Sequence, residues 1–137
     1  MKRRLYSNDP GERPGITDEL AKELASHYEI AFAYLYGSFA ECAPFHDLDI
    51  GVYLRDTRSS MMLSSMLGRR LSVRLKIPVD VRILNDAPVT FLYHVIKGQL
   101  ILTHDDDLLS TIMENTVRRY LDIAPLLLRS TKEAFSP

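Results

Sequence analysis

The stretch that decides the fold is YGSFAECAPFHDLDIGVYL, residues 36–54. Asp47 and Asp49 stand two positions apart at the start of an alternating apolar segment that runs from Leu48 to Leu54. Side chains at positions i and i+2 of a β-strand point to the same face. The pattern therefore predicts a strand with its apolar residues in a core and two neighbouring carboxylates on its open face.

Two interpretations of this pair of carboxylates are open. An exposed strand face is ordinarily polar, so Asp47 and Asp49 are explained without any function if they are simply solvated. Asp is depleted in strands, however, and two like charges at this spacing repel each other unless a cation neutralises them. Carboxylate oxygens are ligands that Mg²⁺ prefers. We therefore predict a Mg²⁺ site at Asp47 and Asp49, able to hold phosphates.

A third carboxylate, Asp80, lies in the later segment VDVRIL, residues 79–84, where apolar and polar residues alternate. This alternation predicts a second half-buried strand with Asp80 and Arg82 on its polar face. Taken alone, Asp80 is equally well explained as an exposed strand residue. If the two strands pair, three carboxylates meet on one surface, which is what two-metal phosphoryl transfer requires.

The segment before the carboxylates has the character of a phosphate-binding turn. Residues 30–36 are apolar throughout, which predicts a central strand covered on both faces, and Gly37 and Ser38 follow at its end. Glycine lets the backbone approach an anion closely, while backbone N–H groups and the Ser38 hydroxyl bond its oxygens. A Gly-Ser pair after a strand is commonly only a turn. The carboxylates downstream favour the phosphate-binding interpretation.

Together, Gly37-Ser38, Asp47-x-Asp49 and the later Asp80 resemble the nucleotidyltransferase superfamily of DNA polymerase β. The short length and the segment RRYLDIAPL, residues 118–126, are most similar to the minimal nucleotidyltransferases (MNT), the antitoxins of HEPN/MNT toxin–antitoxin pairs.

This resemblance implies both a fold and a function. The implied fold is α+β, a mixed twisted sheet with helices packed on one face. The implied activity is a Mg²⁺-dependent transfer of a nucleoside monophosphate, AMP from ATP, to a tyrosine hydroxyl of a partner HEPN toxin. In that reaction Asp47, Asp49 and Asp80 are the catalytic and metal-binding residues, and Gly37 and Ser38 bind the nucleotide.

The loop after Ser38 departs from the family pattern. Only eight residues separate Ser38 from Asp47, a shorter spacing than the minimal family usually has, and Glu41 and Cys42 replace a basic residue and a glycine. An acidic group is unfavourable near a triphosphate, and a lost glycine removes a conformationally free position. Two alternatives stay open: an inactive nucleotidyltransferase-like antitoxin that neutralises its partner by binding, and an antibiotic nucleotidyltransferase with a helical partner subunit.

Length and composition limit the domain organisation and the partners. The 137 residues, 46% of them hydrophobic, suffice for one core. We expect a flexible N-terminal arm over residues 1–16 and a single nucleotidyltransferase domain over residues 17–137. The net charge of −1 and the lack of a basic block argue against a nucleic-acid partner. The lone Cys42, with no membrane span or signal peptide in the pattern, predicts a cytoplasmic protein; homo- and hetero-oligomers both stay open.

The remaining elements follow from periodicity and end signals. Pro125 should kink or break the last helix and leave leucines 126–128 as an apolar turn that packs on the core or on a partner. We also expect a helix from Thr17 to about His27, helices over residues 59–75 and about 88–97, an edge strand over 99–103, and a helix that begins at Asp105–Asp107.

Overall fold

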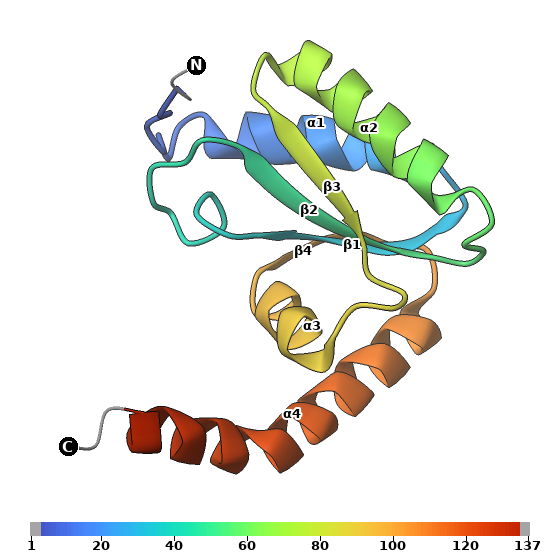
Figure 1. The fold of residues 1–137 in the computed structure, drawn as a ribbon. Coiled ribbons are helices and arrows are strands. Elements are labelled where there is room, and N and C mark those ends of the chain that lie inside the picture. The colour runs from blue at the N-terminus through green and yellow to red at the C-terminus, as the bar shows by residue number, and fades with distance from the viewer. Residues whose placement is uncertain (1–3, 135–137) are drawn as a thin grey trace.

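The computed structural model describes the backbone of residues 4–134 and side chains as far as residue 129. The described chain contains four helices and one four-stranded sheet (Figure 1). In chain order the elements are α1 (Arg13–Ala25), β1 (Ile30–Tyr36), β2 (Leu48–Leu54), α2 (Ser60–Leu75), β3 (Val79–Ile83), α3 (Val89–Ile96), β4 (Gln99–Thr103) and α4 (Asp106–Ala134).

The sheet is mixed, with the strand order β3-β2-β1-β4. β1 pairs antiparallel with β2 on one side and with β4 on the other, whereas β2 and β3 are parallel. All seven residues of β1 are buried, as its continuous apolar sequence predicts for a central strand. The predicted α+β class with a mixed sheet is confirmed. β2 and β3 pair, which was the condition for Asp80 to meet the other carboxylates.

The two faces of the sheet are covered by different helices. Figure 1 shows α1 and α2 on one face and α3 and α4 on the opposite side. On the first face, alternate residues of β1 and β2 pack against leucines of α1 and α2; on the second, Phe32, Tyr34 and Tyr36 of β1 pack against Leu92 of α3 and Leu109 of α4. The sequence predicted helices on one face only. The structure has them on both because β1 is apolar on both sides and each side needs cover.

The N-terminal part of the chain differs from the prediction. α1 begins at Arg13 rather than at Thr17, because Pro14 in its first turn has the fixed φ that suits a helix start. The residues before α1 were expected to form a flexible arm. Instead, Tyr6 forms an isolated antiparallel bridge with Phe45, in the loop between β1 and β2. Residues 1–3 lie outside the described range.

Helix α4 begins as predicted but is not broken by its proline. The Leu108 N–H donates to Asp105 Oδ1 at 3.0 Å, so the acidic run is a helix start. Pro125 lies inside the helix, which continues to Ala134 and changes direction along its length (Figure 1). A proline removes one backbone donor, and a bend accommodates its ring. The leucines that follow Pro125 are therefore helical rather than part of a turn.

The other predicted helices and strands are confirmed with small shifts at their ends. The buried stripe of α2 consists of Leu63, Leu67 and Leu71, spaced four residues apart as in an amphipathic helix. α3 ends just before Gly98, and β4 forms the edge of the sheet next to β1. Within residues 4–134, no helix is both long and apolar enough to span a membrane.

Candidate active site

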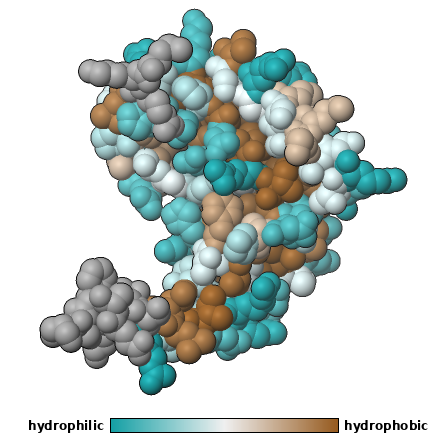
Figure 2. All heavy atoms as spheres, viewed as in Figure 1, coloured by the Kyte–Doolittle hydropathy of each residue, from teal (hydrophilic) through white to brown (hydrophobic). Residues whose placement is uncertain are grey.

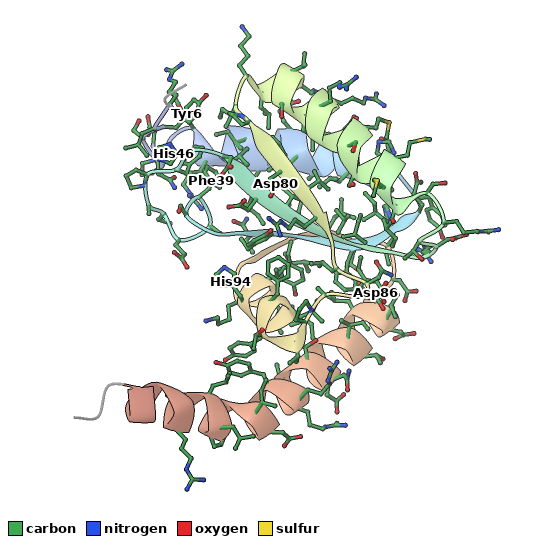
Figure 3. All side chains as sticks on the ribbon, viewed as in Figure 1. Tyr6, Phe39, His46, Asp80, Asp86 and His94 are labelled. Atoms are coloured by element: carbon green, nitrogen blue, oxygen red, sulfur yellow. The ribbon has the colours of Figure 1, made fainter. Side chains whose placement is uncertain are left out.

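The sheet register brings the predicted carboxylates together at one end of the fold. Asp49 in β2 is the Cα partner of Tyr36 in β1 and of Asp80 in β3. Residues paired in this way lie on the same face of adjacent strands. Asp47 directly precedes β2, two positions from Asp49. Tyr36, Asp49 and Asp80 therefore form a row across three strands, with Asp47 at its margin (Figure 3 labels Asp80).

Gly37 is fitted closely to Asp49. Its φ of +82° lies in the left-handed region that glycine tolerates. A Cβ at this position would stand 2.4 Å from Asp49 Oδ2 and 3.3 Å from its Cγ. The Asp49 carboxylate thus lies against the backbone of Gly37, and the following Ser38 is exposed to solvent. The predicted phosphate-binding turn and the predicted metal-binding strand are direct neighbours.

Tyr36 is a member of this site that the sequence did not indicate. Its side chain is 6% exposed, and its ring meets Phe91 and His94 edge to face at centroid distances of 5.5 and 5.8 Å. Burial and then the charge of Asp49 raise its pKa to about 12. Its hydroxyl is therefore a neutral group beside the carboxylates. The one available signal was a hydroxyl-bearing residue inside an apolar strand, directly before Gly37.

Arg82 pairs with the third carboxylate. Its Nε lies 3.3 Å from Asp80 Oδ2, and both side chains are about half exposed. The hydrogen bond to Asp80, with the charge of that carboxylate, raises the pKa of Arg82. Its guanidinium also lies 5.9 Å from the centre of the Phe91 ring. The sequence placed Arg82 on the polar face of its strand but did not indicate that it binds Asp80.

The carboxylates fit Mg²⁺ by donor type, but their present arrangement is not a closed metal site. No three His, Cys, Asp or Glu side chains within residues 4–129 are arranged to hold a metal ion. Asp49 and Asp80 occupy paired positions, yet Asp80 is engaged by Arg82. Oxygen ligands suit Mg²⁺. For Asp80 to bind a cation through Oδ2, this oxygen must exchange its contact with Arg82 for the cation.

Two hollows differ in their relation to this site. A cavity of about 130 Å³ opens beside Gly37, lined by Tyr36, His94 and Lys97 among others. A wider apolar hollow of about 690 Å³ lies at the other end of β2, between Leu54 and Met62, and none of the carboxylates of the row lines it. Of these two hollows, the smaller one is lined by Gly37 and Tyr36, the neighbours of Asp49, so the candidate chemistry points to it.

The fold and the site together define a class of protein. Gly-Ser directly follows the first strand, one aspartate directly precedes the second strand and another lies within it, and a third aspartate lies on the adjacent parallel strand. Together these residues form a candidate site for nucleotide phosphates and a divalent cation. The family model described as "Polymerase beta, Nucleotidyltransferase" matches residues 18–107, about two thirds of the chain. The chain belongs to this nucleotidyltransferase family.

Several solved structures with a similar fold are toxin–antitoxin complexes. A chain of the crystal structure of the toxin–antitoxin MntA-HepT has a TM-score of 0.65 and 20% identity, over 90% of this chain and 99% of that one. A chain of the tri-AMPylated Shewanella oneidensis HEPN toxin in complex with MNT antitoxin has a TM-score of 0.63 and 19% identity, over 88% and 99% of the two chains.

A chain of a toxin–antitoxin structure with AMP-PNP has a TM-score of 0.65 and 20% identity, over 89% of this chain and 98% of that one. At these identities the likeness concerns the fold. No curated protein sequence matches this chain significantly. The match to the family model confirms the resemblance to the DNA polymerase β superfamily that the motifs indicated.

Proposed function

We propose that this chain is a Mg²⁺-dependent nucleotidyltransferase that moves AMP from ATP to a tyrosine hydroxyl of a partner HEPN toxin, and so acts as its antitoxin. The observation that carries the proposal is the contact between Asp49 and Gly37. This contact sets a phosphate-binding turn next to a cation-binding pair. Asp49 is also paired with Asp80 on the adjacent strand. We place this protein in the cytoplasm, where ATP is available.

The proposed reaction assigns a role to each residue of the site. The oxygen of the acceptor hydroxyl attacks the α-phosphorus, the bond from that phosphorus to the bridging oxygen breaks, and pyrophosphate leaves. Gly37 and Ser38 hold the outer phosphates so that pyrophosphate departs in line. Asp47 and Asp49 would hold Mg²⁺, which when bound would neutralise charge on the triphosphate. Asp80 completes the metal site and helps to remove the proton of the acceptor hydroxyl.

A protein acceptor is supported by an exposed apolar surface on α4. Leu126, Leu127 and Leu128 are 63%, 43% and 73% exposed, and Leu121, earlier in the same helix, is 62% exposed. Three successive leucines cover several sides of a helix, so this is more than an isolated surface residue. Figure 2 shows hydrophobic residues on this part of the chain, away from the sheet. The structural neighbours are themselves complexes of an antitoxin with its toxin.

The proposal is tested first by nucleotide binding. Isothermal titration of the purified chain with ATP and GTP, in Mg²⁺ and then in EDTA, is expected to detect metal-dependent binding. The variant Asp47→Ala/Asp49→Ala should lose this binding. Asp56→Ala is the matched control, because Asp56 is an exposed carboxylate after β2 that pairs with Arg58. Equal binding by the double variant and the wild type would refute the site assignment.

A second candidate function is an antitoxin that neutralises its toxin by binding alone. It is favoured by the pairing of Asp80 with Arg82 and by the acidic Glu41 in the loop after Ser38. Co-expression with the partner toxin separates the two candidates. If Asp47→Ala/Asp49→Ala still neutralises the toxin, and mass spectrometry finds no AMP on it, binding alone is sufficient. If neutralisation and the AMP adduct disappear together, transfer is the function.

A further inference from the structure

Two side chains near the N-terminus converge on the loop that follows β1. We name residues 37–46 the phosphate loop. Arg13 Nη1 donates to the carbonyl oxygen of Phe39 at 2.5 Å and to Asn8 Oδ1 at 2.7 Å. Asn8 Nδ2 donates to the same Phe39 oxygen at 3.1 Å and to the Ala43 oxygen at 2.8 Å. Asn8 and Arg13 therefore hold two points of the phosphate loop through one connected set of hydrogen bonds.

The same segment is joined to the far end of the phosphate loop by backbone and ring contacts. Tyr6 exchanges two backbone hydrogen bonds with Phe45, at 2.7 and 3.1 Å, and their rings stack at 5.5 Å. Phe45 in turn meets Phe39 edge to face at 5.0 Å, and the Arg13 guanidinium lies 4.4 Å from the centre of the Phe39 ring. Figure 3 shows Tyr6, Phe39 and His46 gathered at this end of the fold.

The phosphate loop has a conformation that its own residues favour poorly. Cys42 has a φ of +61°, in the left-handed region that costs a non-glycine residue about 1–2 kcal/mol. Three backbone hydrogen bonds hold the loop's turns internally, among them Glu41 N–H to Gly37 O and Ala43 N–H to Ser38 O. The hydrogen bonds from the N-terminal segment add stabilisation that offsets the unfavourable backbone at Cys42.

These hydrogen bonds also set the direction of the loop carbonyls. The oxygens of Phe39 and Ala43 are held towards Asn8 and Arg13. A carbonyl oxygen turned towards a phosphate would repel it, whereas a free backbone N–H would bind it. The N-terminal segment thus keeps two repulsive groups on the side of the loop that faces α1.

We infer that residues 4–13 form a brace that orders the phosphate loop for the phosphates of the nucleotide, with Asn8 and Arg13 as positioning residues. The inference rests on the proposed nucleotide site at Gly37 and Ser38. The brace lies outside the segment that matches the nucleotidyltransferase family, which begins at residue 18.

Hydrogen exchange on the full chain tests the brace without any ligand. In Arg13→Ala and in Asn8→Ala, loss of these hydrogen bonds should speed amide exchange of residues 39–45 by about tenfold, while β1 and α2 exchange as in the wild type. Arg58→Ala is the matched control, since Arg58 is an exposed arginine that pairs with Asp56. Unchanged exchange in the loop of both brace variants would overturn the inference.

Titration with MgATP tests whether the brace serves the nucleotide. Arg13→Ala should weaken binding by about tenfold, and millimolar guanidinium should restore part of the lost affinity in this variant only. Guanidinium rescue separates a positioning role from a general loss of structure. If Arg13→Ala exchanges faster in the loop but binds MgATP as the wild type does, the positioning role is wrong.

The outcomes also separate this inference from the proposed function. Absence of MgATP binding in the wild type would refute the proposed function and, with it, the positioning role. The exchange data would then decide by themselves whether residues 4–13 order the phosphate loop.

Discussion

The carboxylate of Asp49 lies so close to Gly37 that a Cβ at position 37 would stand 2.4 Å from Asp49 Oδ2. Real Cβ atoms do not approach oxygen this closely, so any larger residue must displace the carboxylate or the loop. The backbone of Gly37 is also left-handed, with φ at +82°. The contact therefore couples the phosphate-binding turn to the position of a proposed metal ligand.

Substitution of Gly37 is expected to damage both binding and stability. Gly37→Ala should abolish MgATP binding and lower the free energy of unfolding by about 1–2 kcal/mol, because the left-handed backbone and the contact with Asp49 both oppose a Cβ. Gly15→Ala is the control: a Cβ there meets nothing within 4 Å, in helix α1. It should stabilise the chain by up to about 1 kcal/mol. Titration calorimetry and urea unfolding measure both effects.

Removal of the positive charge on Arg82 is expected to strengthen cation binding. Arg82 Nε lies 3.3 Å from Asp80 Oδ2, so Arg82 competes with a metal ion for this carboxylate. We expect removal of this charge to favour the free energy of cation binding by about 1 kcal/mol. Arg82→Gln should therefore bind Mn²⁺ about fivefold more tightly than the wild type in the absence of nucleotide. Arg118→Gln, which removes an arginine paired with Glu114 on α4, should leave Mn²⁺ affinity unchanged. Weaker Mn²⁺ binding by Arg82→Gln would contradict this interpretation.

The raised pKa of Tyr36 predicts a dependence of stability on alkaline pH. Its folded pKa of about 12 exceeds the ordinary value of 10.0, so the neutral phenol contributes stability that is fully present below pH 10 and is lost between pH 10 and 12. Between neutral pH and about pH 11, the free energy of unfolding should fall by about 1 kcal/mol more in the wild type than in Tyr36→Phe. Urea unfolding at both pH values measures this difference, and parallel losses in the two proteins would refute the assignment.

Substitutions of Cys42 are expected to change the free energy of unfolding according to how well the new residue tolerates a left-handed backbone. Its φ of +61° suits glycine, so Cys42→Gly should raise the free energy of unfolding by up to about 1 kcal/mol, after the larger entropy of glycine in the unfolded chain is subtracted. Cys42→Val should lower it, because a β-branched side chain is the least suited to this region. Thermal unfolding of both variants provides the measurement; a Cys42→Gly protein less stable than Cys42→Val would contradict it.

The exposed leucines of α4 are expected to contribute to partner binding. Leu126→Lys/Leu128→Lys should leave thermal unfolding of the free chain nearly unchanged, since both side chains are exposed. Affinity for the HEPN partner should fall by at least about tenfold, measured by titration or co-purification. Val73→Lys, at an equally exposed apolar position on α2, is the control. Undiminished affinity would place the interface elsewhere.

Much of the fold followed from patterns that extend over only a few residues. The alternation after Asp47 predicted β2, the continuous apolar run predicted the buried β1, and the acidic run at Asp105 predicted the start of α4. Pro125 shows the limit of such reasoning. A proline disfavours a helix locally, but the turns on either side can continue it when the cost is spread over a bend.

By itself, the sequence determined which residues form strands and which carboxylates stand on their polar faces, because side-chain period and end signals act between near neighbours. Only the tertiary structure decided that Asp49 meets Gly37 and that Asn8 binds Phe39, 31 residues further along the chain. Strand register and loop packing select such contacts, and no local pattern encodes which distant segment satisfies a given polar group.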